Sequence, residues 1–175
     1  YDILSGLVGS EMCIRDSNST GEIIEDNNVS SEDTYKIYQS RDGSKVTGYA
    51  IPIAGKGLWG TMYGYFAIEP DVATAKGITF YKHKETPGLG AEVDKDWFKN
   101  NFIGKKFIDD SGELVSIEVI KGFVSDKDPD SKYKVDGISG ATITGTGLTT
   151  FLKADLQKYE PYFAKIRKLN QIESL

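Results

Sequence analysis

Alternating apolar and polar residues predict four β-strands in the middle of the chain. The pattern has a period of two and is interrupted by glycines, which is typical of short strands with one buried face. In the third strand Met62 and Phe66 lie on one face, whereas Tyr63 and Tyr65 lie on the other. The predicted strands cover residues 35–39, 46–53, 59–68 and 76–82. The segment 41–44 (RDGS) contains a glycine that allows positive φ, so we expect a hairpin turn there.

The pattern then changes to a mixture of helix and strand. Residues 92–101 are predicted to be helical, with an apolar face formed by Val93, Trp97 and Phe98. A strand pair is predicted at 105–109 and 113–121, joined by a turn at 110–112. In the second strand of this pair the side chains expected to face inward are Val115, Ile117 and Val119, and those expected on the opposite face are Ser116 and Glu118.

The last predicted element has the clearest helical pattern. An apolar stripe at 146–160 consists of Leu148, Phe151, Leu152, Leu156 and Tyr159. Pro161 is predicted to end this helix, and residues 162–169 are predicted to form a short terminal helix. Together the elements predict an α+β fold in which helices pack on an antiparallel β-sheet.

The first 34 residues differ in character from the rest. Residues 1–17 resemble a translated sequencing-adaptor read-through, so we expect them to be non-native; the alternative is a natural terminal strand or loop. Residues 18–34 contain five acidic residues, no lysine or arginine and few large apolar groups, which predicts a solvated linker. We therefore expect the folded domain to cover residues 35–170, with residues 1–34 contributing little to it.

Composition excludes several classes of function. The chain has 175 residues, of which 39% are hydrophobic, so it can bury a hydrophobic core without needing a disulfide or a structural metal. A lone Cys13 and a lone His83 predict neither a disulfide nor a metal site. A net charge of −5 argues against nucleic acid as a partner. No apolar run approaches the roughly 18 residues that a membrane-spanning helix needs.

Residues 83–90 (HKETPGLG) form the first segment with candidate chemistry. The proline fixes one φ angle, and Gly88 and Gly90 permit backbone conformations that other residues avoid. Such a loop can bring its backbone N–H groups close to a flat or anionic ligand. The alternative is an ordinary strand-to-helix connection.

Residues 136–147 (DGISGATITGTG) form the second such segment, directly ahead of the amphipathic helix. Small residues and hydroxyls at a helix start favour contact with a phosphate, because the N–H groups there are free and no bulky side chain blocks access. A simple Ser/Thr cap requires only one hydroxyl. The segment lacks the GK[ST] of a Walker loop and the GxGxxG of a dinucleotide fold. Thr142, Thr144 and Thr146 are all candidate hydroxyls from this pattern.

Together, ISGAT and ETPGLG resemble the periplasmic FMN-binding domain of bacterial respiratory flavoproteins. The run GKGLWGTMYG at 55–64 and the closing PYFAKIR resemble the branch formed by the C subunits of Na+-translocating NADH:quinone reductases. The resemblance covers about residues 33–170. It implies that the final threonine of the D-G-x-S-G-A-T motif, Thr142, is esterified to the phosphate of FMN. The residues it implies as further contacts of the cofactor are Asp136, Ser139, Gly140, Ala141, Thr144, Glu85, Thr86, Gly88, Leu89, Gly90, Leu58 and Trp59.

The same resemblance implies a function. It implies an electron-transfer subunit of a membrane-bound, Na+-translocating NADH:quinone reductase, with other subunits as partners and a flavin transferase acting during maturation. The domain is expected on the periplasmic side of the bacterial inner membrane, behind an N-terminal membrane helix that is not present in this chain. The alternatives are the homologous FMN-carrying G subunit of the ion-pumping ferredoxin:NAD+ oxidoreductase, or a non-redox extracytoplasmic binding module.

Overall fold

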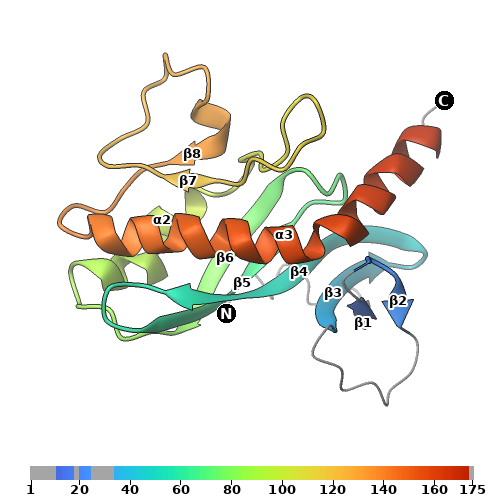
Figure 1. The fold of residues 1–175 in the computed structure, drawn as a ribbon, viewed down its shortest axis with the longest axis horizontal. Helices are drawn as coiled ribbons and strands as arrows, with labels where there is room; N and C mark the ends of the chain where they lie inside the picture. Colours follow the sequence, from blue (N-terminus) through green and yellow to red (C-terminus); the bar gives the residue numbers. More distant parts are fainter. Residues whose placement is uncertain (1–10, 18–19, 25–33, 174–175) are drawn as a thin grey trace.

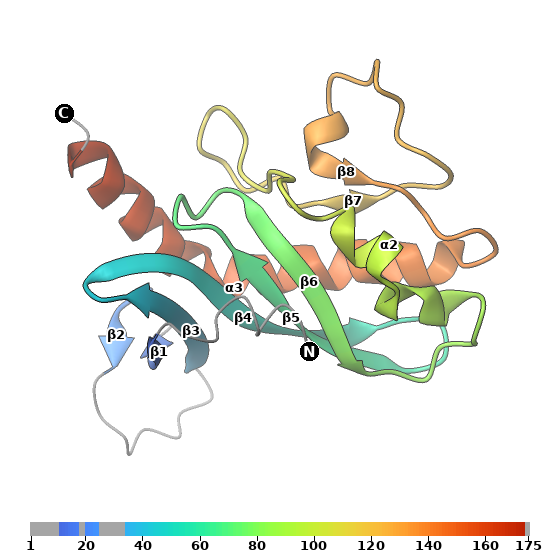
Figure 2. The ribbon, with the colours of Figure 1, turned by 180° about the vertical axis from the view of Figure 1, so that it is seen from behind.

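The computed structural model describes residues 11–17, 20–24 and 34–173. A six-stranded antiparallel sheet, in the order β2-β1-β3-β4-β5-β6, is covered on one face by the long helix α3 (Figures 1 and 2). The strands are β1 (Glu11–Ser17), β2 (Ile23–Ile24), β3 (Tyr35–Asp42), β4 (Lys45–Lys56), β5 (Thr61–Ile68) and β6 (Ala75–Lys82). The four predicted strands correspond to β3–β6, and the predicted α+β class is confirmed.

The hairpin between β3 and β4 turns at Gly43, whose φ of 58° lies in the left-handed region that glycine adopts without strain. Asp42 pairs with Lys45 across it, in agreement with the predicted turn at 41–44.

The N-terminal part of the chain differs from expectation. Residues 11–17 form β1, which pairs with β3 along its whole length, from Glu11 opposite Arg41 to Ser17 opposite Tyr35. Gly21 passes so close to α3 that a Cβ added to it would lie 2.4 Å from the carbonyl carbon of Pro161. Residues 11–17 and Gly21 therefore take part in the fold. Without β1, the edge of β3 would expose backbone N–H and carbonyl groups, and β1 pairs with them. The non-native origin of 1–17 stays a prediction, and residues 1–10 and 25–33 lie outside the described part.

Helix α3 (Thr142–Glu173) is one element of 32 residues, so the prediction that Pro161 ends it is wrong. Proline removes one intrahelical hydrogen bond and bends a helix, and Figure 1 shows the last turns of α3 directed away from the rest. Tyr159, Tyr162 and Phe163 are buried on both sides of the bend, and their packing offsets the lost bond. The helix also begins at Thr142, four residues earlier than predicted.

The predicted helix at 92–101 is split into a 3-10 turn, η1 (Gly90–Asp94), and a short α2 (Asp96–Asn100). Val93 and Phe98 are buried as expected. Trp97 is not: its ring is exposed and its Nε1–H donates to Glu92 at 3.1 Å. The break between the two turns rotates Trp97 away from the core.

The predicted strand pair at 105–109 and 113–121 is mostly wrong, because the two segments, both described by the structure, pair as strands only at an isolated bridge between Ile108 and Leu114. β7 (Glu118–Val119) is a two-residue strand that pairs in parallel with β8 (Lys134–Val135), which follows η2 (Ser131–Tyr133). Ser116 has a φ of 71° and is buried, whereas Val115 is exposed, which reverses the side predicted for both. A left-handed residue ends the strict alternation of a strand. Ile117 and Val119 are buried as predicted.

The core lies between the inner face of the sheet, α3 and the segment that runs from η1 to β7. The predicted helical stripe of α3 is buried over its full length. Opposite it, the largest fully buried side chains of the sheet are Phe66, Ile37, Ile51, Ile53, Met62, Ile68 and Ile78. This packing fixes the start of α3 against the end of β4, where Gly147 lies against Lys56.

Candidate functional site

The DGISGAT motif leads directly into the first turn of α3. Thr142 is the first residue of the helix, and its side chain is exposed. The first intrahelical bond in this turn runs from the Gly145 N–H to the Ala141 carbonyl at 3.1 Å. The N–H groups of residues 142–144 thus precede the hydrogen-bonded part of the helix and carry its positive dipole end. This is a site suited to an anion.

Asp136, at the other end of the motif, has a structural contact. Its Oδ1 accepts a hydrogen bond from the Val124 N–H at 2.7 Å, and the adjacent Gly137 N–H donates to the Gly122 carbonyl at 2.8 Å. Asp136 therefore fastens the loop after β7 to the motif. Ser139 is exposed, and Gly140 has a φ of 74°, which a side chain would strain.

A hollow of about 530 Å³ lies beside Thr142. It combines the end of β4 and the turn after it with one face of the first turns of α3. Its lining residues are Lys56, Gly57, Leu58, Thr142, Ile143, Thr146, Gly147, Thr150 and Phe151. Leu58, predicted from the resemblance, thus lines the same hollow as Thr142, whereas neighbouring Trp59 is exposed outside it. A Cβ on Gly147 would lie 2.3 Å from the Lys56 carbonyl oxygen, so the glycine allows the helix to lie this close.

Six residues of the hollow were not predicted for the site from sequence: Lys56, Gly57, Ile143, Gly147, Thr150 and Phe151. A signal for one of them was present, because threonines recur every fourth residue at 142, 146 and 150 and so share one helix face. Thr146 and Thr150 each donate a hydroxyl hydrogen bond to the carbonyl four residues earlier, at 3.0 and 2.8 Å.

The predicted loop at 83–90 lies against the motif. The Leu89 side chain packs on Gly140, where an added Cβ would lie 2.8 Å from Leu89 Cδ2. The Thr86 carbonyl accepts from the N–H groups of Leu89 and Ala91 at 3.1 Å, and Gly88 has a φ of 72°. The loop is therefore a closed turn that presents Leu89 towards the start of α3.

Glu85 and Thr144 are directed into the protein and not towards the hollow. Thr144 is fully buried and its Oγ1–H donates to Glu85 Oε2 at 2.6 Å. The other carboxylate oxygen accepts from the Trp59 N–H at 3.0 Å. Gly90 is also buried beneath this carboxylate. Of the three candidate hydroxyls, only those of the exposed Thr142 and Thr146 are open to a ligand in this conformation.

His83 braces the same loop. Its Nδ1 accepts from the Glu85 N–H at 3.1 Å, so its Nε2 carries the proton that is shared with Asp94 at 2.6 Å. Neither contact involves a serine hydroxyl, and a Ser–His–Asp arrangement is not built on this residue.

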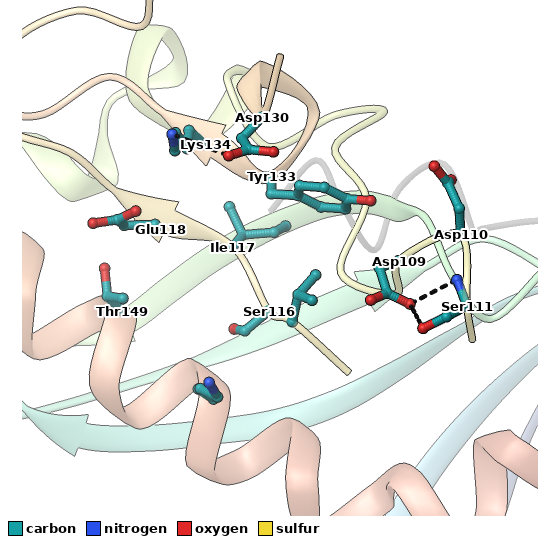
Figure 3. Close-up of a pocket in the computed structure, with 12 residues that line it drawn as sticks. Asp109, Asp110, Ser111, Ser116, Ile117, Glu118, Asp130, Tyr133, Lys134 and Thr149 are labelled. Atoms are coloured by element: carbon teal, nitrogen blue, oxygen red, sulfur yellow. Dashed lines mark hydrogen bonds and ion pairs between the residues drawn. The ribbon is translucent and has the colours of Figure 1, made fainter. Parts of the chain in front are cut away.

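A second, larger hollow of about 660 Å³ lies on another side of α3 (Figure 3). It contains no residue of the glycine-rich motifs. Asp109 in its wall accepts from the hydroxyl and the N–H of Ser111 and from the Glu113 N–H, and these contacts, the Ser111 hydroxyl foremost, hold the pKa of Asp109 below its ordinary value. The carboxylate is thus engaged in a turn, and we place the candidate site at the smaller hollow.

Metal binding and membrane insertion can both be judged for the described residues. In this part of the chain no cluster of three or more histidine, cysteine or acidic side chains is placed to bind a metal ion. Nor does any helix within it combine the length and apolar character needed to cross a membrane.

Comparison with known proteins gives consistent matches. The family model of the FMN-binding domain matches residues 57–157. The chain is 40% identical over 136 residues to the C subunit of the Na(+)-translocating NADH-quinone reductase from Yersinia pestis and 37% identical over 134 residues to that from Pseudomonas aeruginosa. These alignments cover 76% and 75% of this chain but 50% and 51% of the relatives. The chain thus spans about half the length of the curated relatives it matches.

Solved structures agree with the fold. The crystal structure of Shewanella oneidensis NqrC superposes with a TM-score of 0.78 at 27% identity, covering 95% of this chain and 87% of that one. The crystal structure of the C subunit of the Na(+)-translocating NADH-quinone reductase from Parabacteroides distasonis gives a TM-score of 0.74 at 34% identity, covering 86% and 77%.

Proposed function

The chain belongs to the FMN-binding domain family, and from this premise we propose that it is an electron-transfer subunit whose FMN is esterified through its phosphate to Thr142. The observation that carries the proposal is the position of Thr142. Its exposed hydroxyl stands on the first residue of α3, beside the hollow that also contains Leu58.

The residues around Thr142 fit the phosphate end of FMN. A phosphodiester at Thr142 would keep one negative charge, and the N–H groups of the first helical turn would stabilise it. Lys56, in the wall of the same hollow, adds a positive charge. Gly140 and Ala141 would place no long side chain beside the phosphate.

Apolar side chains at this end of the domain fit the isoalloxazine ring. Leu58, Leu89 and Ile143 are 40%, 42% and 60% exposed and gather around the start of α3, and a group of exposed apolar side chains at one place is typical of a surface that a ligand or partner covers. They would exclude water from one side of the ring. When bound, FMN supplies one- and two-electron redox chemistry, and the chain's own residues hold and shield it.

At the level of the whole protein, we propose membership in a membrane-bound, Na+-translocating NADH:quinone reductase complex. The support is the similarity to C-subunit relatives that extend beyond this chain. The partners would be the other subunits, and a flavin transferase would attach the cofactor. The domain would lie on the periplasmic side of the bacterial inner membrane, anchored by an N-terminal helix.

The test is co-expression of the chain with a flavin transferase, followed by acid precipitation and intact-mass measurement. We expect yellow protein whose FMN survives denaturation and maps to the peptide that contains Thr142. Thr142→Val should be folded and colourless. Thr146→Val, which removes the other exposed hydroxyl of the hollow, is the matched control and should stay fully flavinylated. FMN retained on Thr142→Val would overturn the attachment site, and colourless wild type would favour a non-redox binding module.

A further inference from the structure

One buried carboxylate joins three segments of the candidate site. Glu85 is only 5% exposed, and both of its oxygens accept hydrogen bonds. Oε1 accepts from the Trp59 N–H in the turn after β4, at 3.0 Å, and Oε2 accepts from the Thr144 hydroxyl in the first turn of α3, at 2.6 Å. These partners are 26 and 59 residues away in sequence. The side chain therefore links the 83–90 loop, the 57–60 turn and the helix start.

Two glycines of the sequence motifs make room for this carboxylate. A Cβ on Gly57 would lie 2.6 Å from Glu85 Oε1, and one on Gly90 would lie 2.5 Å from Oε2. Such distances are shorter than any normal contact between these atoms. At these two positions the absence of a side chain is thus explained by the protein's own carboxylate, without any ligand.

The carboxylate also determines where the walls of the hollow stand. The 57–60 turn is closed by the Gly57 N–H donating to the Gly60 carbonyl at 2.8 Å, and Glu85 holds it at Trp59. Thr144 follows Thr142 by two residues in the same helical turn. Leu58 is next to Trp59, and Thr142 is in the same turn as Thr144. The two hydrogen bonds of Glu85 therefore set the distance between Leu58 and Thr142.

We propose that Glu85 is the positioning residue of this site. It fixes the attachment hydroxyl and the Leu58 wall relative to each other, and in this proposal it does so without the direct cofactor contact that the sequence resemblance implies for it. The part of this inference that concerns the flavin rests on the proposed function. We call the two hydrogen bonds that Glu85 accepts from Trp59 and Thr144 the Glu85 clamp, and the existence of this clamp does not depend on the proposed function.

The test begins with paired variants in the full chain. Glu85→Gln keeps the size of the side chain but removes its negative charge. The amide oxygen can still accept from the Trp59 N–H, and the amide NH2 then faces Thr144, whose hydroxyl must accept instead of donate, so two charge-assisted hydrogen bonds are replaced by weaker neutral ones. Thr144→Val removes the hydroxyl, and Thr144→Ser restores it. With limiting flavin transferase, we expect Glu85→Gln and Thr144→Val each to lower the initial rate of flavinylation about tenfold or more, because small misplacements of reacting groups have large effects. Thr144→Ser should retain the wild-type rate.

The double variant and a matched control distinguish positioning from general damage. Glu85→Gln combined with Thr144→Val should be no slower than the slower single variant, because both substitutions disrupt the same contact. Glu92→Gln removes a carboxylate that bonds the Trp97 ring next to the same loop and should leave the rate unchanged. The visible circular dichroism of attached flavin should change in Glu85→Gln but not in Glu92→Gln, a signature that loss of stability alone does not produce.

Wild-type rates in both Glu85→Gln and Thr144→Val, or fully additive losses in the double variant, would overturn the clamp. If Glu85→Gln does not fold, the comparison of Thr144→Val with Thr144→Ser still decides. FMN found on another residue of the wild type would count against the proposed function alone. In that case non-additive melting temperatures of the same variants, measured without flavin, still test the link between Glu85 and Thr144.

Discussion

Asp155, in the middle of α3, accepts a hydrogen bond on Oδ2 from the backbone N–H of Ala54 at 2.8 Å. Ala54 lies beyond Ala50, the last residue of β4 that pairs with β3. Asp155 of α3 thus satisfies a backbone N–H of β4 at a position where β3 no longer pairs with it. Its other oxygen accepts from Lys158 at 2.6 Å, so a largely buried carboxylate has partners on both oxygens.

Replacement of Asp155 by alanine should destabilise the domain by about 1–3 kcal/mol, because a buried backbone N–H is left without an acceptor. Urea unfolding followed by circular dichroism measures the loss. Lys158→Ala is the control: this lysine is half exposed, and its removal should change stability by less than about 1 kcal/mol. Equal effects of the two substitutions would show that the ion pair, and not the strand contact, is what matters.

Gly147→Ala should separate the start of α3 from the end of β4. Its Cβ would lie 2.3 Å from the Lys56 carbonyl oxygen, which we expect to reduce stability by about 1–3 kcal/mol even though alanine favours helix by about 1 kcal/mol. Gly60→Ala, where the nearest atom is the flexible Lys84 Cδ at 3.6 Å, should stay within about 0.5 kcal/mol of wild type. Thermal unfolding of both variants compares them, and a neutral Gly147→Ala would contradict the close approach.

The turn between β5 and β6 should make stability depend on acid pH. Burial raises the pKa of Asp71, but hydrogen bonds from the Thr74 hydroxyl, the Ala73 N–H and Lys106 outweigh it and hold that pKa below its ordinary value. A lowered folded-state pKa adds stability that is complete above the unfolded pKa of about 3.9 and lost as the pH falls through the folded value.

The unfolding midpoint of Asp71→Asn should therefore lie below that of wild type near neutral pH. The difference should shrink as the pH is lowered from about 5 towards 2. A constant difference across this range would mean that the charge of Asp71 has no part in the effect.

Leu89→Lys should shift the flavin spectrum or reduction potential while FMN stays attached, because Leu89 packs on Gly140 and not on Thr142 itself. A positive charge near the ring favours the reduced, more negative flavin, so the potential should rise. Leu169→Lys places the same charge on an exposed leucine of the last turns of α3 and should leave both quantities unchanged. An identical response to the two substitutions would place the ring elsewhere.

Local patterns were sufficient for much of this fold. The four central strands and the buried stripe of α3 follow from periodicity, because each alternation persists over enough residues to define one buried face. The position of Thr142 at a helix start was likewise readable, since small residues and hydroxyls precede the apolar stripe. Its proposed link to FMN rests on the resemblance.

Other features depend on contacts between distant residues. Nothing near Pro161 in sequence reveals that Tyr159 and Phe163 continue the helix into the core. The left-handed Ser116 reverses an alternation that otherwise reads as a strand. Glu85 has no local sign that its partners are Trp59 and Thr144, so its internal role emerges only when the three segments are seen together.

The Glu85 clamp has a consequence for how fast a redox group held at this site exchanges electrons. A site whose polar groups must rearrange whenever a nearby charge changes adds that reorganisation to the barrier, whereas preorganised groups do not. The helix start, the turn at Trp59 and the loop with Leu89 are tied to one carboxylate whose oxygens are both already engaged. These segments have little freedom to rearrange when a nearby charge changes. A site of this kind has a small reorganisation energy, which favours fast single-electron transfer.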